Sequence, residues 1–170
     1  MILRPATNAD APDLAKLGAE TFVAAFGDLY TPEDLAAFLA EVHGEAAVAA
    51  EVAGDSCTHR LVEVDGKLVA FCKLRHPSQF TAYTDARDPI ELGQLYALPG
   101  HTGTGIGAKL MDWALEVARE GRHDAILLSV YAENFGAQRF YQRYGFSKIA
   151  DITFRVGEQL DPEFLYELKL

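Results

Sequence analysis

The sequence predicts one α/β domain of the α+β type over residues 1–170, in which a single mixed, mostly antiparallel sheet carries helices on both faces. Three observations support this. A chain of 170 residues with 49% apolar and 24% charged residues suits one globular domain with a sizeable core. Two β-rich runs surround Asp65-Gly66, which is a hairpin signal. A strand–helix–strand pattern from Ile90 to Val130 requires a right-handed crossover between parallel strands.

The first third of the chain reads as one strand followed by helices. Residues 1–5 form a short strand, and Thr7 with Asp10 resembles a capping box that begins a helix. Thr31-Pro32-Glu33-Asp34 begins a second helix, because a cap, a proline at the first helical position and acids in the first turn follow one another. A third, Ala-rich helix covers residues 45–52.

The remaining elements follow from changes of hydrophobic period and from Gly, Pro and Asn signals. Apolar residues in the helix that precedes Gly121 lie on one stripe, and residues 125–130 are a continuous apolar run, typical of a strand buried on both faces. We expect strands at 59–64 and 68–74, a polar connection at 76–89, a strand at 90–98, a helix ending at Gly121, a strand at 125–130, a helix from Asn134 to Gly145, and a closing antiparallel pair at 146–156 and 164–168.

Composition limits the classes of function. The net charge of −10 argues against general binding to nucleic acid. No apolar run approaches the ~20 residues that a membrane helix needs, and no signal peptide is evident, so a cytoplasmic protein is the default expectation. Cys57 and Cys72 form no metal-spaced pair, and we predict no metal site.

The most informative stretch is the junction between the strand at 90–98 and the helix that follows it. Gly103, Gly105 and Gly107 alternate there, and each can adopt a left-handed backbone conformation and let a ligand approach closely. The first N–H groups of a helix have no partner inside it, and the helix dipole favours an anion at that end. The junction therefore predicts a phosphate-binding turn, although a connector that binds nothing is an alternative.

Two other phosphate-binding motifs fit less well. Gly103 to Ala108 also matches the looser dinucleotide pattern Gly-x-Gly-x-x-Ala, but that motif normally follows the first strand of a longer unit. It is also followed by an acidic residue ~20 positions later, at a strand end, whereas here the next strand, at 125–130, ends without an acid until Glu133. A Walker loop is excluded because the run Gly107 to Leu110 lacks Gly-Lys-Ser/Thr.

Two blocks of residues resemble the GNAT superfamily of N-acetyltransferases. The first runs from Leu95 to Pro99 and continues into Thr102 to Gly107; family members usually carry Gln or Arg where Thr102 stands. The second comprises Asn134, Ala137, Phe140-Tyr141 and Gly145-Phe146. The resemblance covers nearly the whole chain and implies the GNAT fold, acetyl-CoA as the acyl donor and a primary amine as the acceptor.

The resemblance also implies a binding mode for the coenzyme. Backbone groups of Tyr96, Ala97 and Leu98 are expected to pair with the pantetheine arm like an added strand, and one of their N–H groups to serve the acetyl oxygen. Asn134 is expected to contact the coenzyme, although an ordinary helix N-cap explains it equally well. The amides that would hold the pyrophosphate are those of Gly103, Thr104, Gly105, Ile106, Gly107 and Ala108.

Acetyl transfer needs an acid and a base. An alkyl amine with a pKa near ~10.4 arrives protonated, and a thiol with a pKa of about ~8.5 leaves more readily with a proton donor. Tyr141 is the candidate acid, because family members often place a Tyr at this position near the thiol; an aromatic of the core is the alternative. Glu91 is the candidate base, with an exposed charge at the end of the strand as the alternative. Gly93 suggests a bulge beside it.

The acceptor is the least determined part of the prediction. The two ends of the chain look similar to the bacterial spermine/spermidine acetyltransferase branch, and acids gather around the expected acceptor wall, which favours a polyamine. An N-terminal peptide or another small amine, and a non-catalytic sensor of coenzyme A, are alternatives. A homodimer is left open. The acids are Glu20, Asp28, Glu33, Asp34 and Glu41 in the early helices, with Asp85, Asp88 and Glu91 near the central strand.

Overall fold

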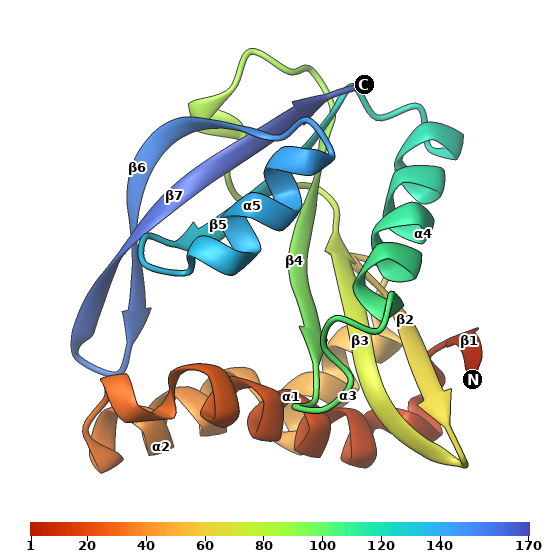
Figure 1. Ribbon diagram of the computed structural model, residues 1–170, viewed down its shortest axis with the longest axis vertical. Helices are drawn as coiled ribbons and strands as arrows, with labels where there is room; N and C mark the ends of the chain where they lie inside the picture. The colour runs from red at the N-terminus through yellow and green to blue at the C-terminus, as the bar shows by residue number, and fades with distance from the viewer.

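The computed structural model describes all 170 residues, and its core is one seven-stranded sheet with helices on both faces (Figure 1). No helix in it is long and apolar enough to cross a membrane. The α-helices and strands, in chain order, are β1 (Ile2–Pro5), α1 (Ala11–Phe26), α2 (Pro32–Val42), α3 (Glu45–Ala53), β2 (Cys57–Val64), β3 (Lys67–Arg75), β4 (Pro89–Ala97), α4 (Ile106–Glu120), β5 (Ala125–Tyr131), α5 (Phe135–Arg143), β6 (Ser147–Val156) and β7 (Gln159–Lys169).

The strand order is β1-β2-β3-β4-β5-β7-β6, and every neighbouring pair except β4–β5 is antiparallel. The mixed, mostly antiparallel sheet is thus confirmed, with its one parallel pair where the crossover through α4 required it. Asp65 and Gly66 both have positive φ angles, of 51° and 74°, as the two-residue hairpin between β2 and β3 demands.

The helix starts also follow the sequence. The Thr7 backbone N–H donates to Asp10 Oδ2 over 2.8 Å, which closes the first half of the capping box before α1. The Thr31 hydroxyl accepts from the Asp34 N–H over 3.2 Å at the start of α2. Each bond satisfies a donor that would otherwise lack a partner at a helix end.

The sheet separates two apolar layers. Alternate residues of β3 show this: Ala70 and Cys72 belong to the large core with α4 and α5, whereas Phe71 between them packs against α1 and α3. Trp113 of α4 is 7% exposed and belongs to the large core, as its place on the apolar stripe predicts. A third cluster joins Phe22 and Phe38 of the early helices to β6.

The centre of the sheet opens. β4 and β5 pair only from Pro89 to Glu91 with Ala125 to Leu127, although both strands continue beyond these rungs. In Figure 1 the part of the sheet formed by β5, β7 and β6 swings away from β4 toward α2. The edges of β4 and β5 past this point therefore have no strand between them.

The predicted bulge is present. Lys73 pairs with Gln94 and Leu74 with Leu92, so Gly93 is the extra residue on β4. A Cβ on Gly93 would come within 3.3 Å of Lys73 Cε, which explains the residue type at that position.

One strand is longer than predicted. β7 begins at Gln159 rather than at residue 164, and Pro162 sits opposite Thr153 of β6 within the ladder. The additional segment brings Asp161 and Glu163 into the sheet.

Candidate active site

A cleft of about 570 Å³ lies in the opening between β4 and β5. Its walls come from β4 (Glu91 to Ala97), the end of β5, α5, the strands β6 and β7, and the aromatic side chains of α1 and α2. Tyr141, Glu91, Tyr96, Ala97 and Asn134 all line it. The structure thus brings together both predicted catalytic residues and three of the predicted coenzyme contacts.

Another hollow, of about 650 Å³, lies between α4 and the first two strands. It is open, and charged side chains such as Arg60, Lys109 and Glu116 form most of its lining. None of the predicted site residues reaches it, so the smaller cleft is the candidate active site.

The glycine turn has the expected backbone. Gly103 and Gly105 have φ angles of 73° and 86°, and nothing lies within 4 Å of the position a Cβ would take on either. Gly105 caps α4, and the first intrahelical bond runs from the Lys109 N–H to the Gly105 carbonyl. The N–H groups of Ile106, Gly107 and Ala108 therefore have no helical partner.

Gly107 differs from the two glycines before it. It lies inside α4 with no positive φ, and a Cβ there would meet Phe140 at an ordinary distance of 3.7 Å. The chain itself thus requires glycine at 103 and 105 but not at 107, where only the close approach of a ligand could require it.

The free backbone edge of β4 differs in part from the predicted set of Tyr96, Ala97 and Leu98. The Leu98 N–H donates to the Val69 carbonyl and its own carbonyl accepts from the His101 N–H, so Leu98 has no backbone group left for a coenzyme. In an antiparallel pair, hydrogen-bonded and non-bonded residues alternate, and Ala97 opposite Ala70 is therefore non-bonded. The N–H and C=O groups of Leu95 and Ala97, rather than those of Tyr96 and Leu98, point into the opening.

Tyr141 is part of the large core and also lines the cleft. Its ring packs against Phe140 and Phe146 in the large core, and the residue is only 8% exposed, yet it lines the cleft. Burial raises the pKa of the Tyr141 hydroxyl, with the neighbouring Cys72 and Tyr96 adding to the shift, so the group stays protonated at neutral pH. A protonated phenol at the wall of a cleft is a proton donor.

Glu91 is buried, 3% exposed, and firmly held, so it is not an exposed charge at a strand end. Its Oε2 accepts from the Ser78 hydroxyl over 3.2 Å and from the Gln79 N–H over 3.0 Å, and its Oε1 accepts from Gln79 Nε2 over 3.0 Å. These three bonds fix the 76–88 connection to the narrow end of the cleft, and they engage both carboxylate oxygens.

Two acidic residues of the cleft were missed from the sequence, Asp161 and Glu163 of β7. Asp161 is fully bonded: its Oδ2 accepts from the Tyr30 hydroxyl over 2.5 Å and its Oδ1 from Gln159 Nε2 over 2.7 Å. Glu163 Oε2 is buried without any hydrogen-bond partner. Burial raises the pKa of Glu163 to about 7; the Ser129 hydroxyl opposes this rise and the Asp161 carboxylate adds to it. The alternation of acids at 161, 163 and 167 was the signal that could have found them.

Asn134 and Thr102 both line the cleft. The Asn134 side chain accepts from the Ala137 N–H over 3.1 Å, so it caps α5 while also lining the cleft. Thr102 is exposed and lines the cleft as well, whereas the turn residues that follow it lie outside its walls.

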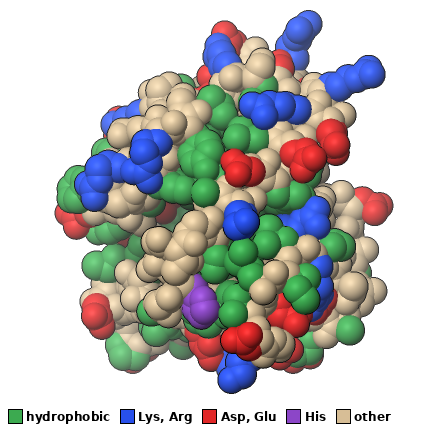
Figure 2. Space-filling model, turned by 45° about the vertical axis from the view of Figure 1, so that its right-hand side comes forward, with side chains coloured by type: hydrophobic (Ala, Val, Ile, Leu, Met, Phe, Trp, Pro, Cys, Tyr) green, Lys and Arg blue, Asp and Glu red, His purple; other side chains and the backbone are tan.

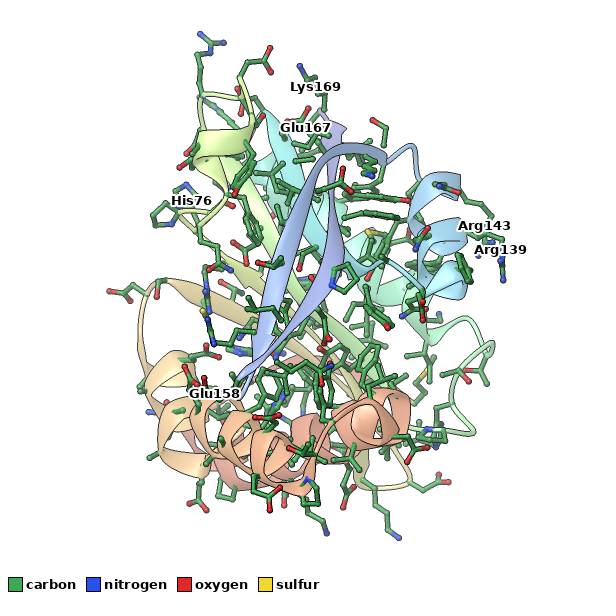
Figure 3. The ribbon with its side chains drawn as sticks, turned by 90° about the vertical axis from the view of Figure 1, so that its left-hand side faces the viewer. His76, Arg139, Arg143, Glu158, Glu167 and Lys169 are labelled. Carbon is green, nitrogen blue, oxygen red and sulfur yellow. The ribbon has the colours of Figure 1, made fainter.

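A histidine cluster lies away from the cleft. His76 Nε2 and His123 Nδ1 contact the two Asp88 carboxylate oxygens at 2.7 and 2.9 Å, and these three side chains are close enough together to hold a cation. In Figure 3 His76 projects outward from the side of the sheet. The three side chains join the 76–88 connection to the turn after α4 and line no part of the cleft.

A sheet opened beside a helix that begins with a left-handed glycine turn offers free backbone groups to an extended ligand and unpaired N–H groups to an anion. Comparison with known proteins agrees. Residues 17–146 match the acetyltransferase (GNAT) family, and the chain belongs to that family. It is an acetyl-CoA-dependent N-acetyltransferase by class.

Two relatives and two solved structures match this chain over nearly its whole length. The chain is 32% identical over 156 residues to an uncharacterised N-acetyltransferase of Mycobacterium bovis, covering 92% of this chain and 95% of the relative. It is 28% identical to another from Lactobacillus delbrueckii over 95% and 92% of the two chains. The PaiA N-acetyltransferase of Thermoplasma acidophilum, solved with coenzyme A, shares the fold with a TM-score of 0.80 at 19% identity, covering 99% and 98% of the chains. YncA of Salmonella typhimurium, solved with acetyl-CoA, has a TM-score of 0.67 at 19% identity, over 100% and 94%.

Proposed function

We propose that the cleft transfers the acetyl group of acetyl-CoA to the primary amine of a small molecule, without nucleic acid or a membrane as partner and in the cytoplasm. The observation that carries the proposal is the opening between β4 and β5. It exposes unpaired backbone groups of Leu95 and Ala97 in the cleft that Tyr141 also lines.

The chain has the features that a pantetheine diphosphate requires. An extended thioester arm pairs with the free groups of Leu95 and Ala97 as an added strand would. The pyrophosphate lies against the N–H groups from Gly103 to Ala108, where left-handed glycines and the start of α4 supply donors and the positive end of the helix dipole. Thr102 and Asn134 contact the coenzyme at the entrance, with Thr102 as a neutral replacement for the usual Gln or Arg.

Tyr141 acts as the general acid. As the amine nitrogen attacks, the carbonyl oxygen gains negative charge, which an N–H group of Leu95 or Ala97 stabilises. The carbon–sulfur bond then breaks, and the Tyr141 hydroxyl gives its proton to the departing sulfur. The phenol recovers a proton from the nitrogen that has formed the amide bond, so the residue ends as it began.

Glu91 is a candidate for the base and, more directly, a positioning residue. Its three accepted hydrogen bonds hold Ser78 and Gln79 against the narrow end of the cleft. A carboxylate with both oxygens engaged is a weaker proton acceptor than a free one, because each donated bond stabilises its ionised form.

The acceptor faces an aromatic wall. Phe22 lies 4.4 Å from Phe38, 5.2 Å from Phe26 and 5.9 Å from Tyr30 between ring centroids, and all four side chains line the cleft. Such a wall suits an amine that carries an apolar group, and aromatic faces also attract an ammonium ion.

A polyamine such as spermidine has weaker support than the sequence suggested. Of the eight acids named above, only Glu41 and Glu91 line the cleft, and the others lie elsewhere: Asp34 accepts from the Glu158 N–H, Asp85 pairs with Lys169, and Asp88 pairs with the histidines. Figure 2 shows Lys and Arg side chains interspersed with acids on the face that it presents. No relative supports the spermine/spermidine branch.

The test is a comparison of acceptors by thiol release from acetyl-CoA. We expect kcat/KM to be higher for an arylalkylamine such as phenethylamine than for spermidine or an N-terminal peptide. A preference for spermidine that weakens with added salt would favour the polyamine instead, since attraction between solvated charges is screened. Binding of acetyl-CoA without transfer to any amine would favour a sensor.

A further inference from the structure

The cleft holds three buried or half-buried carboxylates, and they differ in what occupies their oxygens. Glu91 accepts three hydrogen bonds and Asp161 accepts two. Glu163 is the exception, because its Oε2 is sealed from water yet has no partner. A buried polar atom without a partner costs on the order of 1–3 kcal/mol, and such an atom in a cleft calls for a functional explanation.

From this contrast we propose that Glu163 is the catalytic residue that binds the ammonium group of the acceptor and removes its proton. The inference rests on the proposed acetyltransferase function and deepens it. It assigns the role of base to β7 rather than to Glu91 of β4, and it defines the acceptor as a primary ammonium ion that enters the cleft from the side of the aromatic wall.

The sheet register places Glu163 across the opening from the free backbone edge of β4. Glu91, Leu127 and Glu167 share one row across the sheet at the closed end of the opening. Glu163 is four residues farther along β7, about 13 Å from that row at the rise of an antiparallel strand. Leu95 lies at a comparable distance along β4, and Ala97 lies two residues farther on, so Glu163 faces the free backbone edge across the opening.

The orientation of the side chain agrees with this position. Glu163 pairs with Tyr131 of β5, and directly opposite residues share a face of the sheet, so its side chain points to the same face as Tyr131 and Ser129. All three line the cleft. Tyr96 of β4 lies close enough for the Glu163 carboxylate to add to the burial that raises the pKa of its hydroxyl, which links the two walls.

The chemistry of the neighbours suits a base that works at neutral pH. The groups around Glu163 are the Asp161 carboxylate and the hydroxyls of Ser129, Tyr30, Tyr96 and Tyr131. The other charged residues that line the same cleft are Lys73, Arg75, Glu91 and Glu41. Lys73 Nζ is engaged at 2.9 Å by Glu51. No cation of the chain pairs with Glu163, and an ammonium ion from outside would be its first cationic partner.

The proton balance is complete with these groups. The ammonium ion gives one proton to the Glu163 carboxylate, and the carboxyl later releases it to water. The neutral nitrogen forms its bond to the acetyl carbon as the carbon–sulfur bond breaks. The second proton leaves the nitrogen and replaces the one that Tyr141 donates to sulfur. The products are an N-acetyl amine, a free thiol and one released proton.

The first test compares kcat/KM against pH for the wild type, Glu163→Gln and Asp161→Asn, using phenethylamine and acetyl-CoA. The wild type should gain activity with rising pH around the pKa of about 7. Above that pH, kcat/KM of E163Q should be at least about 100-fold lower than that of the wild type, as expected when a general base is removed. Its kcat/KM should also show no rise with pH around 7. Asp161→Asn should keep the rise and move it to lower pH, because one source of the raised pKa is gone. Persistence of the rise in E163Q, with its loss in Glu91→Gln, would overturn the inference in favour of Glu91.

The second test needs no acetyl transfer. Carbon NMR of the glutamate carboxyl groups should show one group of the wild type that titrates near pH 7 and is missing from E163Q. Phenethylamine alone should lower that midpoint, since a bound cation favours the carboxylate. A midpoint that the amine leaves unchanged would refute ammonium binding by Glu163, whether or not the protein transfers acetyl groups. Failure of all amines to release thiol would refute the proposed function instead.

Discussion

The substitution Glu163→Gln should stabilise the fold at alkaline pH. The pKa of Glu163 rises from its ordinary 4.5 to about 7 because the folded protein buries the carboxyl. In the unfolded chain the group ionises near its ordinary pKa, so the folded state binds more protons between these two values and loses stability as pH rises through them. At about 1.4 kcal/mol per pH unit, the loss above the folded pKa amounts to about 3 kcal/mol as an upper bound.

Urea unfolding of the wild type and the variant at about pH 5 and about pH 8.5 measures this difference. Relative to the wild type, the free energy of unfolding of the variant should rise little at the lower pH and by up to about 3 kcal/mol at the higher pH. Glu158→Gln is the matched control, because the Glu158 side chain is 97% exposed at the β6–β7 turn (Figure 3) and should change stability little at either pH. An equal gain for E163Q at both pH values would refute the reasoning, since burial of a charge could not then be its cause.

Three further predictions concern the coenzyme and the acid. Gly105→Val should raise the Kd of acetyl-CoA at least about tenfold, about 1.4 kcal/mol, because its φ of 86° disfavours a side chain; calorimetry would contradict this by finding unchanged affinity in a folded variant. Gly107→Ala should stabilise the protein through α4 by up to about 1 kcal/mol, measured by urea unfolding. If the variant also binds acetyl-CoA more weakly, a phosphate group of the coenzyme lies close to residue 107. Tyr141→Phe should retain coenzyme affinity and slow turnover about 100-fold or more; a loss below threefold would make the hydroxyl dispensable.

The fold could be predicted because each element carries its own local signal. Asp65-Gly66 needs positive φ at both residues, Thr31 satisfies a free N–H, and the apolar run from Ala125 must be covered on both faces. Each of these signals depends on only a few neighbouring residues, so it can be read from the sequence alone. The glycine turn belongs to the same class, since left-handed φ angles at Gly103 and Gly105 are a local requirement.

The site could be predicted only where it is local. Tyr141 and Glu91 both line the cleft, but the partners that decide the role of Glu91 lie 12 and 13 residues away in a loop without a motif. Glu163 went unnoticed because it lies outside the predicted strand at 164–168, and because its position depends on the pairing of β7 with β5. Which carboxylate lies without a partner depends on how distant strands pair with one another. The periodicity of residues along the chain does not contain that information.

The central claim is that this cleft moves an acetyl group from acetyl-CoA to an amine under the control of Glu163. The most direct measurement is amine-dependent thiol release across the pH range, with mass spectrometry of the product, for the wild type and E163Q. We predict an N-acetylated amine whose rate of formation rises through a midpoint near pH 7 in the wild type and lacks that rise in E163Q. Thiol release without acetylated amine, or identical pH profiles for the two proteins, would contradict the account.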